Sequence, residues 1–89
     1  MAAPYRSTPV FDETTLPAAL RGAHNTKAGV WGVIRVLEGR LVYTIIDPPS
    51  QHVLTPDAPG LVSPQQKHFV TPVGRVRCRV DFYDAPPEL

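Results

Sequence analysis

Few side chains in this sequence could do metal or acid–base chemistry, and they are widely spaced. The chain has three histidines, His24, His52 and His68, and a single cysteine, Cys78. A neutral imidazole binds zinc, iron, nickel or copper, and it can also serve as a general acid or base. Two histidines without a carboxylate or a thiolate form only a weak metal site unless another ligand or a water molecule completes it. Cys78 alternates with apolar residues, which predicts a buried and inert thiol.

Positive side chains are a second source of binding chemistry. Lys27 could hold an anionic ligand if it lies at the mouth of a partly apolar barrel, or it could be a solvated loop residue. Arg75, Arg77 and Arg79 alternate along one predicted strand and could bind an anion. Such a row is also typical of a solvated sheet face that discourages edge aggregation. Asp81 follows on the same predicted face and partly neutralises it.

Size and charge limit the class of protein. The 89 residues make one small domain, whose stability margin is thin unless a metal, a disulfide or a partner subunit helps. The single cysteine excludes an internal disulfide, and the opening MAAPYRSTPVF lacks the pattern of a secretory signal, so we expect a cytoplasmic protein. No apolar run approaches the ~20 residues of a membrane span. The net charge of +1 gives no sequence-wide field for nucleic acid or membrane binding.

The elements that must position these residues are mostly strands. Eleven prolines lie between apolar runs, which is typical of turns in an all-β chain. Residues 1–13 predict an extended arm, with Val10 and Phe11 as its apolar anchor. Thr14 or Thr15 can cap one short helix over residues 16–21. We expect residues 14–89 to form a single β domain.

From Gly29 onward, β-branched and aromatic residues predict short strands. Their expected ranges are 29–37, 40–46, 52–54, 61–62, 68–70 and 75–83. Glu38-Gly39 indicates a tight turn that joins the first two strands in a hairpin, and residues 72–74 indicate a turn before the last strand. Both faces of this hairpin are largely apolar, so the outer face needs cover from the Val10-Phe11 arm or from a second subunit. We therefore expect a homodimer.

Four sequence blocks together resemble the TehB/YeaR-like domain family. They are Thr14-Thr15-Leu16-Pro17 … Leu20, His24-Asn25-Thr26-Lys27-x-Gly29-x-Trp31-Gly32, Leu37-x-Gly39-x-Leu41-x-Tyr43 and Pro64-x-x-x-His68-x-Val70. The resemblance covers about Tyr5 to Tyr83 and implies an all-β, small cupin-like (RmlC-like) jelly roll or barrel with one short N-terminal helix. Members of the family occur as stand-alone small proteins or ahead of a methyltransferase in tellurite-resistance proteins. We expect the stand-alone form, since the chain has no Gly-rich nucleotide loop.

The resemblance also implies that the barrel could hold a divalent metal. Cupins commonly hold a divalent metal with two histidines and a glutamate from one motif and a histidine from a second. If Gly39 closes the first motif, the carboxylate position falls at Gly32, and His24 alone represents the histidine pair. His68 is the histidine of the second motif. His24 and His68 are thus candidate ligands for zinc, iron or nickel, and the side chains that could complete the set are His52, Gln66 and Lys67.

We expect a ligand pocket in the barrel. Its candidate lining residues are His24, Asn25, Thr26, Lys27, Trp31, Tyr43 and His68. Asn25 and Thr26 could instead only stabilise the loop, and Trp31 and Tyr43 could belong to the core or to an interface.

Three function classes remain open. The first is a non-catalytic module that binds a small polar or anionic molecule, with a stress or tellurite-resistance association implied by the resemblance. The second is a small metal-dependent enzyme that uses His24 and His68, and the third is a structural or partner-binding module. The missing carboxylate favours the first class, with no certain cofactor.

Overall fold

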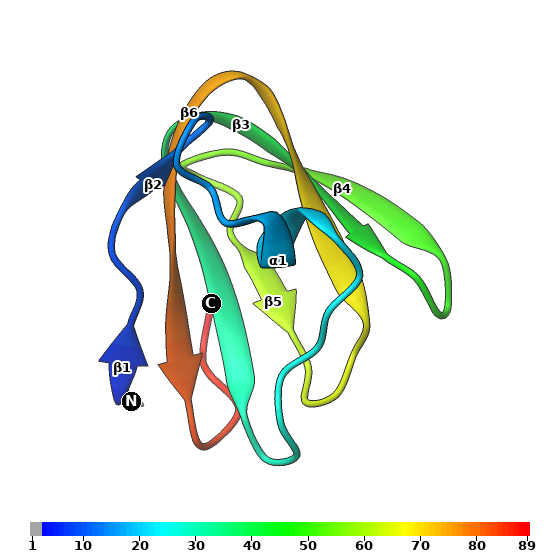
Figure 1. Ribbon diagram of the computed structural model, residues 1–89. Helices are drawn as coiled ribbons and strands as arrows, with labels where there is room; N and C mark the ends of the chain where they lie inside the picture. The colour runs from blue at the N-terminus through cyan, green and yellow to red at the C-terminus, as the bar shows by residue number, and fades with distance from the viewer. Residues whose placement is uncertain (1–2) are drawn as a thin grey trace.

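Two long strands, β3 (Trp31–Ile45) and β6 (His68–Tyr83), form the frame of the protein, which the computed structural model describes over residues 3–89. They pair antiparallel along almost their whole length, from Trp31 opposite Tyr83 to Ile45 opposite His68. Both strands bend over in the middle, so that each forms an arch with two legs (Figure 1). The result is a small all-β domain.

Four short strands complete the sheet around this frame. On one edge of β3 lie β5 (Gly60–Val62), beside its first half, and β4 (Ser50–Leu54), beside its second half. On the free edge of β6 lie β1 (Arg6–Ser7) and β2 (Phe11–Asp12). The sheet therefore runs in the order β1-β6-β3-β4, with β2 and β5 as additional partners of β6 and β3.

The bend of the two long strands is produced by glycines in a left-handed conformation. Gly39 has φ of +83° and Gly74 has φ of +66°, values that side-chain-bearing residues rarely adopt. Gly39 lies opposite Val76, whereas Arg40, the next residue, lies opposite Val73. The intervening residues of β6 form a β-bulge, which bends the strand and increases its twist.

Two turns expected from the sequence are therefore wrong. Residues 38–39 do not close a hairpin between two strands, and residues 72–74 do not separate a short strand from the last one. Both sequences lie inside continuous strands. A G1-type bulge uses the same left-handed glycine as a tight turn, so the glycine alone does not distinguish the two.

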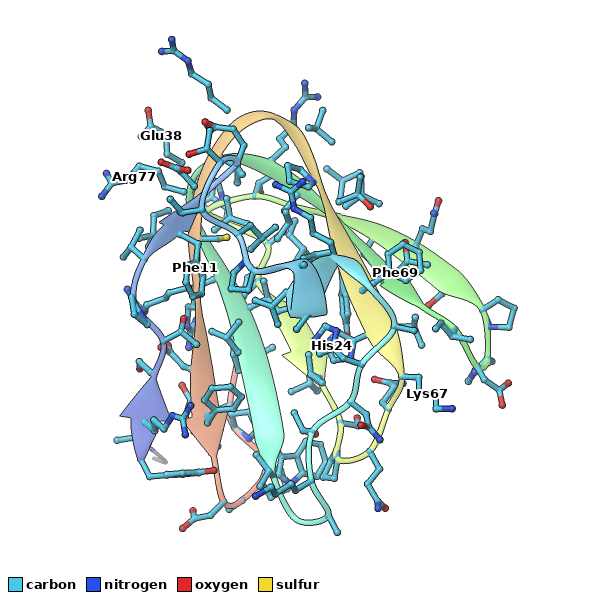
Figure 2. The ribbon with its side chains drawn as sticks, in the orientation of Figure 1. Phe11, His24, Glu38, Lys67, Phe69 and Arg77 are labelled. Atoms are coloured by element: carbon cyan, nitrogen blue, oxygen red, sulfur yellow. The ribbon has the colours of Figure 1, made fainter. Side chains whose placement is uncertain are left out.

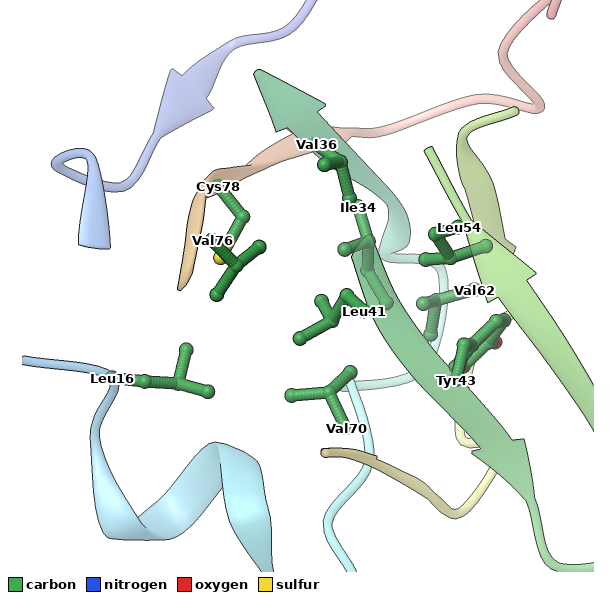
Figure 3. Packing of buried hydrophobic residues seen from close by; sticks show 10 residues of the cluster. All are labelled: Leu16, Ile34, Val36, Leu41, Tyr43, Leu54, Val62, Val70, Val76 and Cys78. Atoms are coloured by element: carbon green, nitrogen blue, oxygen red, sulfur yellow. The ribbon is translucent and has the colours of Figure 1, made fainter. Parts of the chain in front are cut away.

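The core lies inside the bent sheet (Figure 3). Its buried members come from every large element and from the segment before the helix: Leu16, Ile34, Val36, Leu41, Tyr43, Leu54, Val62, Val70, Val76 and Cys78. The alternation expected for residues 75–83 is confirmed at Val76 and Cys78, which point inward, and at Arg75 and Arg77, which are exposed. The buried thiol of Cys78 matches the sequence prediction.

Asp81 departs from that pattern because it is buried on the outer face, with 3% exposure. Its carboxylate accepts hydrogen bonds from Nε of Arg35 at 3.1 Å and from Nε of Arg79 at 3.0 Å. The hydroxyl of Ser7 donates a third bond at 2.7 Å. One carboxylate thus ties β1, β3 and β6 together on the face opposite the core.

One helix, α1 (Ala18–Arg21), lies within the described residues, as expected, but it begins later than predicted. The N-cap position is Pro17, and no side chain caps the helix, so the predicted cap at Thr14 or Thr15 is wrong. The carboxylate of Asp12 instead accepts bonds from the backbone nitrogens of Thr14 at 2.7 Å and Thr15 at 3.0 Å. These bonds close a turn before α1.

The predicted arm is extended but belongs to the sheet, since β1 and β2 both pair with β6. Phe11 packs against the core, while Val10 is 44% exposed, so Phe11 alone is the anchor. Met1 and Ala2 of the predicted arm lie outside the described residues. Within residues 3–89, no helix has the length and apolar character that a membrane span requires.

Candidate functional site

A cavity of about 320 Å³ lies inside the bent sheet, enclosed by α1 and the loop that follows it. This volume falls in the range of small-molecule sites, about 300–1,000 Å³. Most of its lining is apolar: Phe11, Leu16, Leu20, Val30, Ile34, Leu41, Val62, Val70, Cys78, Val80 and Phe82. Because these residues come from both halves of β3 and β6, the cavity exists only when both strands are bent.

Five of the seven sequence-predicted site residues line the cavity, Tyr43 belongs to the core, and Trp31 is half-buried outside both. His24, Asn25, Thr26, Lys27 and His68 line the cavity together. The remaining two, Trp31 and Tyr43, are not part of its lining within residues 3–89.

The backbone brings the two cavity histidines together. His24 N donates to His68 O at 3.0 Å, and His68 N donates to His24 O at 2.9 Å. This isolated antiparallel bridge holds the imidazole centroids 4.1 Å apart, with the ring planes at 56°. In Figure 2, His24 lies beside the first leg of β6, below α1.

Hydrogen bonds fix which nitrogen of each ring carries the proton. Nδ1 of His24 bonds Gly22 O at 2.9 Å, and Nδ1 of His68 bonds Gln66 O at 2.8 Å. A carbonyl oxygen only accepts, so each Nδ1 donates and each neutral ring keeps its lone pair on Nε2. Within residues 3–89, every buried polar side-chain atom has a hydrogen-bond partner. Nε2 of His68 has no hydrogen-bond partner within residues 3–89, so it is not one of these buried atoms. It must therefore reach a space that water or a ligand can enter.

Burial keeps His68 neutral. Its side chain is almost fully buried, and this desolvation lowers its pKa below the usual 6.5. The carbonyl of Gln66 opposes the shift, while the charge of a protonated His24 would act in the same direction as burial. The site therefore offers an uncharged acceptor at neutral pH.

Tyr43 supports His68 from the core side. The two rings meet edge-on with centroids 5.5 Å apart. The Tyr43 hydroxyl donates to Leu61 O at 2.8 Å, and burial raises the pKa of Tyr43 to about 12. Tyr43 thus acts as a neutral brace for the histidine ring.

The loop after α1 is held by Thr26. Its hydroxyl donates to Val30 O at 2.8 Å and accepts from Gln65 N at 3.3 Å, while Thr26 O accepts from Gln65 N at 3.1 Å. Thr26 therefore stabilises the loop, the alternative that the sequence left open. Asn25 and Lys27 are exposed on the same loop.

The residues present do not fit a cupin-type metal centre. Within residues 3–89, no group of three or more histidine, cysteine or acidic side chains could hold an ion together. His52 cannot complete the histidine pair, because it is exposed on β4 and bonds Ser50 Oγ at 3.1 Å. Gln66 Oε1 accepts from Ser63 N at 3.4 Å, and Lys67 is exposed. Zinc usually takes three or four protein ligands, so two imidazoles are too few.

Sequence reasoning missed one cavity residue with binding chemistry, Arg6. It lies opposite Phe82 in the pairing of β1 with β6, and its guanidinium lies 5.4 Å from the Phe82 ring centroid. Both residues line the cavity. A strand of two residues carries no periodic pattern, so no signal in the sequence pointed to this contact.

Comparison with known proteins gives a consistent match. A family model described as a TehB-like domain matches residues 6–80. Two curated relatives from Haemophilus influenzae are both named "Probable S-adenosyl-L-methionine-dependent methyltransferase TehB". The protein of strain Rd is 33% identical over 85 residues, and that of strain 10810 is 32% identical over 85 residues. Each match covers 89% of this chain, which spans about 30% of the relative's length.

Two crystal structures share the fold. TehB from H. influenzae superposes with a TM-score of 0.82 at 31% sequence identity, covering 91% of this chain and 30% of that chain. A protein from Escherichia coli strain K12 gives a TM-score of 0.84 at 22% identity, covering 97% of this chain and 93% of that chain. The all-β architecture therefore occurs both within a longer chain and in one of similar length.

Proposed function

This chain belongs to the TehB-like domain family, and from that premise we propose that it is a cupin-type domain that binds a small molecule in the cavity beside His24 and His68. The ligand has an apolar body and a group that donates a hydrogen bond. Binding without catalysis is the function that the geometry supports best.

The observation that carries the proposal is the pair of histidines in the lining of an apolar cavity, whose Nε2 atoms make no hydrogen bond within residues 3–89. Nδ1 of each histidine is held by a backbone carbonyl, so the acceptor side of each ring is fixed before a ligand arrives. Preorganisation of this kind lowers the entropy cost of binding. A hydroxyl is the complementary group, because a neutral Nε2 only accepts a hydrogen bond.

A metal-dependent enzyme is the less supported alternative. It would need a third ligand, and none lies with His24 and His68 in the described part of the chain. The names of the H. influenzae relatives instead raise a link to methyl transfer, and in those relatives the matching region is about 30% of the chain. Tellurite, the anion implied by the family resemblance, belongs in any ligand screen.

The test compares 1-octanol with 1-methoxyheptane, an ether of the same size that has no hydrogen-bond donor. Titrations are followed by amide chemical shifts and by calorimetry. We expect 1-octanol to shift amides of cavity residues and to bind about fivefold more tightly than the ether, since one hydrogen bond contributes about 1 kcal/mol. Potassium tellurite is titrated in parallel.

Histidine-to-phenylalanine variants show whether the acceptor is responsible. His24→Phe and His68→Phe each keep an aromatic ring but remove one Nε2, so each should reduce the preference for 1-octanol over the ether and the double variant should abolish it. The matched control is His52→Phe, which changes an exposed histidine outside the cavity lining and should keep the preference.

A smaller cavity gives a second, independent readout. Gly32→Ala adds a methyl group at the cavity wall, where its Cβ would make an ordinary contact of 3.4 Å with Val62 Cβ. Gly32→Ala should weaken the binding of both compounds without unfolding the protein. The proposal is wrong if 1-octanol does not bind, or if it shifts amides of β4 and leaves those of the cavity unchanged.

A further inference from the structure

The charges around the cavity all have one sign. Within residues 3–89, no acidic residue contributes to the lining, while Arg6, Lys27 and Arg79 do. Arg79 is paired with Asp81, with Nε 3.0 Å from a carboxylate that also pairs with Arg35. Arg6 and Lys27 are exposed and form no ion pair within the described residues. The cavity therefore has two available positive charges and no carboxylate to neutralise them.

Arg6 is the better placed of these two cations. Its guanidinium lies over the Phe82 ring, 5.4 Å from the centroid. Stacking on an aromatic face restricts a guanidinium while leaving its edge donors free for two hydrogen bonds to one carboxylate. Lys27 supplies a second charge from the loop after α1.

The arch of β6 separates this charge from the histidines. His68 begins the strand and Phe82 lies near its end, and the strand turns back on itself between them. Figure 1 shows the two legs of β6 on either side of α1, with β1 beside the second leg. A ligand that fills the cavity thus meets Arg6 at one side and His68 at the other.

We infer that this cavity selects an amphipathic organic anion, whose anionic group binds Arg6 while its apolar body fills the space between the two legs of β6. A hydrogen-bond donor at the far end of the molecule reaches Nε2 of His68. The inference rests on the proposed function. It adds that the ligand is negatively charged and that Arg6 binds its anionic group. An amine of the same shape is rejected because it would meet Arg6 and Lys27 as a like charge.

The experiment uses four compounds with one eight-carbon chain: octanoate, 8-hydroxyoctanoate, 1-octanol and octylamine. Calorimetry at neutral pH and low ionic strength gives their affinities for the wild-type chain. 8-Hydroxyoctanoate should bind about twofold to fivefold more tightly than 1-octanol, which has the same hydroxyl donor but no charge; this is the range of an exposed ion pair. The hydroxy acid should bind most tightly, and octylamine should bind least.

Arg6→Gln isolates the charge, and Arg40→Gln is the matched control. Arg40 is also exposed on a strand but does not line the cavity in the described residues. Arg6→Gln should reduce the affinity for octanoate about twofold to fivefold and leave that for 1-octanol unchanged. Arg40→Gln should leave both affinities unchanged.

The outcomes separate the two proposals. If 8-hydroxyoctanoate and 1-octanol bind wild type equally, or if Arg6→Gln and Arg40→Gln have equal effects on octanoate, the inference about the anion is wrong although the cavity still binds ligands. If none of the four compounds binds, both the inference and the proposed function fail.

Discussion

The carbonyl oxygen of Arg75 occupies the space that a Cβ atom at Gly39 would need. Because Gly39 also has φ of +83°, alanine there would be strained and would clash with backbone. We expect Gly39→Ala to reduce the free energy of unfolding by about 3 kcal/mol in urea titrations. Gly74→Ala is the control, since its Cβ meets nothing within 4 Å, and its left-handed φ should cost about 1 kcal/mol. Equal effects would show that the bend does not depend on this close contact.

Asp81 should stabilise the outer face in a pH-dependent way. Burial by itself raises the pKa of Asp81, but hydrogen bonds from Arg79, Ser7 and Arg35 together lower it below 3.8. A carboxyl group whose pKa is lowered by folding stabilises the protein above its unfolded pKa, and that contribution is lost as pH falls through the folded value.

The variant Asp81→Asn should therefore cost stability only where the carboxylate is ionised. We expect a loss of about 1–2 kcal/mol at pH 7, less than for a fully buried pair because the two arginine side chains are 32% and 37% exposed. Urea titrations at several pH values should show that the difference in free energy of unfolding between wild type and Asp81→Asn becomes smaller below about pH 4. A difference that does not change with pH would show that the ionised carboxylate is not the source of the stabilisation.

His68 should make the protein sensitive to mild acid. Its pKa is lowered by burial, so the unfolded chain, where the value is near 6.5, binds protons more readily than the folded one. Stability should therefore fall as pH drops from 6.5 towards the folded pKa. His68→Gln should remove this dependence, whereas His52→Gln, at an exposed position, should retain it. Thermal unfolding of the three proteins between pH 7 and pH 5 is the measurement, and parallel curves would exclude His68 as the cause.

The sequence was sufficient to predict the types of secondary structure in the fold, but not how the strands are joined and paired. β-branched runs and turn residues predicted an all-β domain with one short helix, and the alternation at Val76 and Cys78 predicted which side of the last strand is buried. The glycines at positions 39 and 74 were interpreted as turns because the same left-handed conformation serves a turn and a bulge. Only the pairing of β3 with β6 distinguishes the two.

The candidate site could be predicted where it is local in sequence or carried by the family resemblance. His24 to Lys27 form one loop, and His68 joins them through the backbone bridge. Arg6 could not be found, because its role depends on pairing with Phe82 at the other end of the chain. Tyr43 belongs to the core, one of the roles that the sequence suggested for it.

Metal content distinguishes a ligand cavity from a metal centre. With two imidazoles and no third ligand in residues 3–89, we expect protein purified without a histidine tag to retain far less than one zinc, iron or nickel ion per chain. The double variant His24→Ala/His68→Ala should give the same elemental analysis. Stoichiometric metal that the variant loses would overturn this expectation.

The homodimer expected from the apolar outer face stays a prediction. Val42 and Val53 lie opposite each other on β3 and β4, and Val53 is 57% exposed. Their outward-facing neighbours Thr44, Gln51 and Thr71 are uncharged, and Arg40, two residues before Val42 on β3, lies towards the end of this face, so a dimer must keep the two copies of Arg40 apart. Light scattering should give the mass of a dimer for wild type and of a monomer for Val53→Lys. A monomeric wild type would refute the prediction.

The attachment of β1 and β2 to the last strand has a consequence for synthesis. Ser7 and Asp81, which share a hydrogen bond, are 74 residues apart in the chain. β1 and β2 therefore have no partner until β6 has also emerged from the ribosome, and pairing over such separations is slow. β1 and β2 thus remain unpaired during most of the synthesis of the domain. A stalled or truncated chain that ends before β6 would expose the same strands permanently, as a substrate for chaperones and proteases.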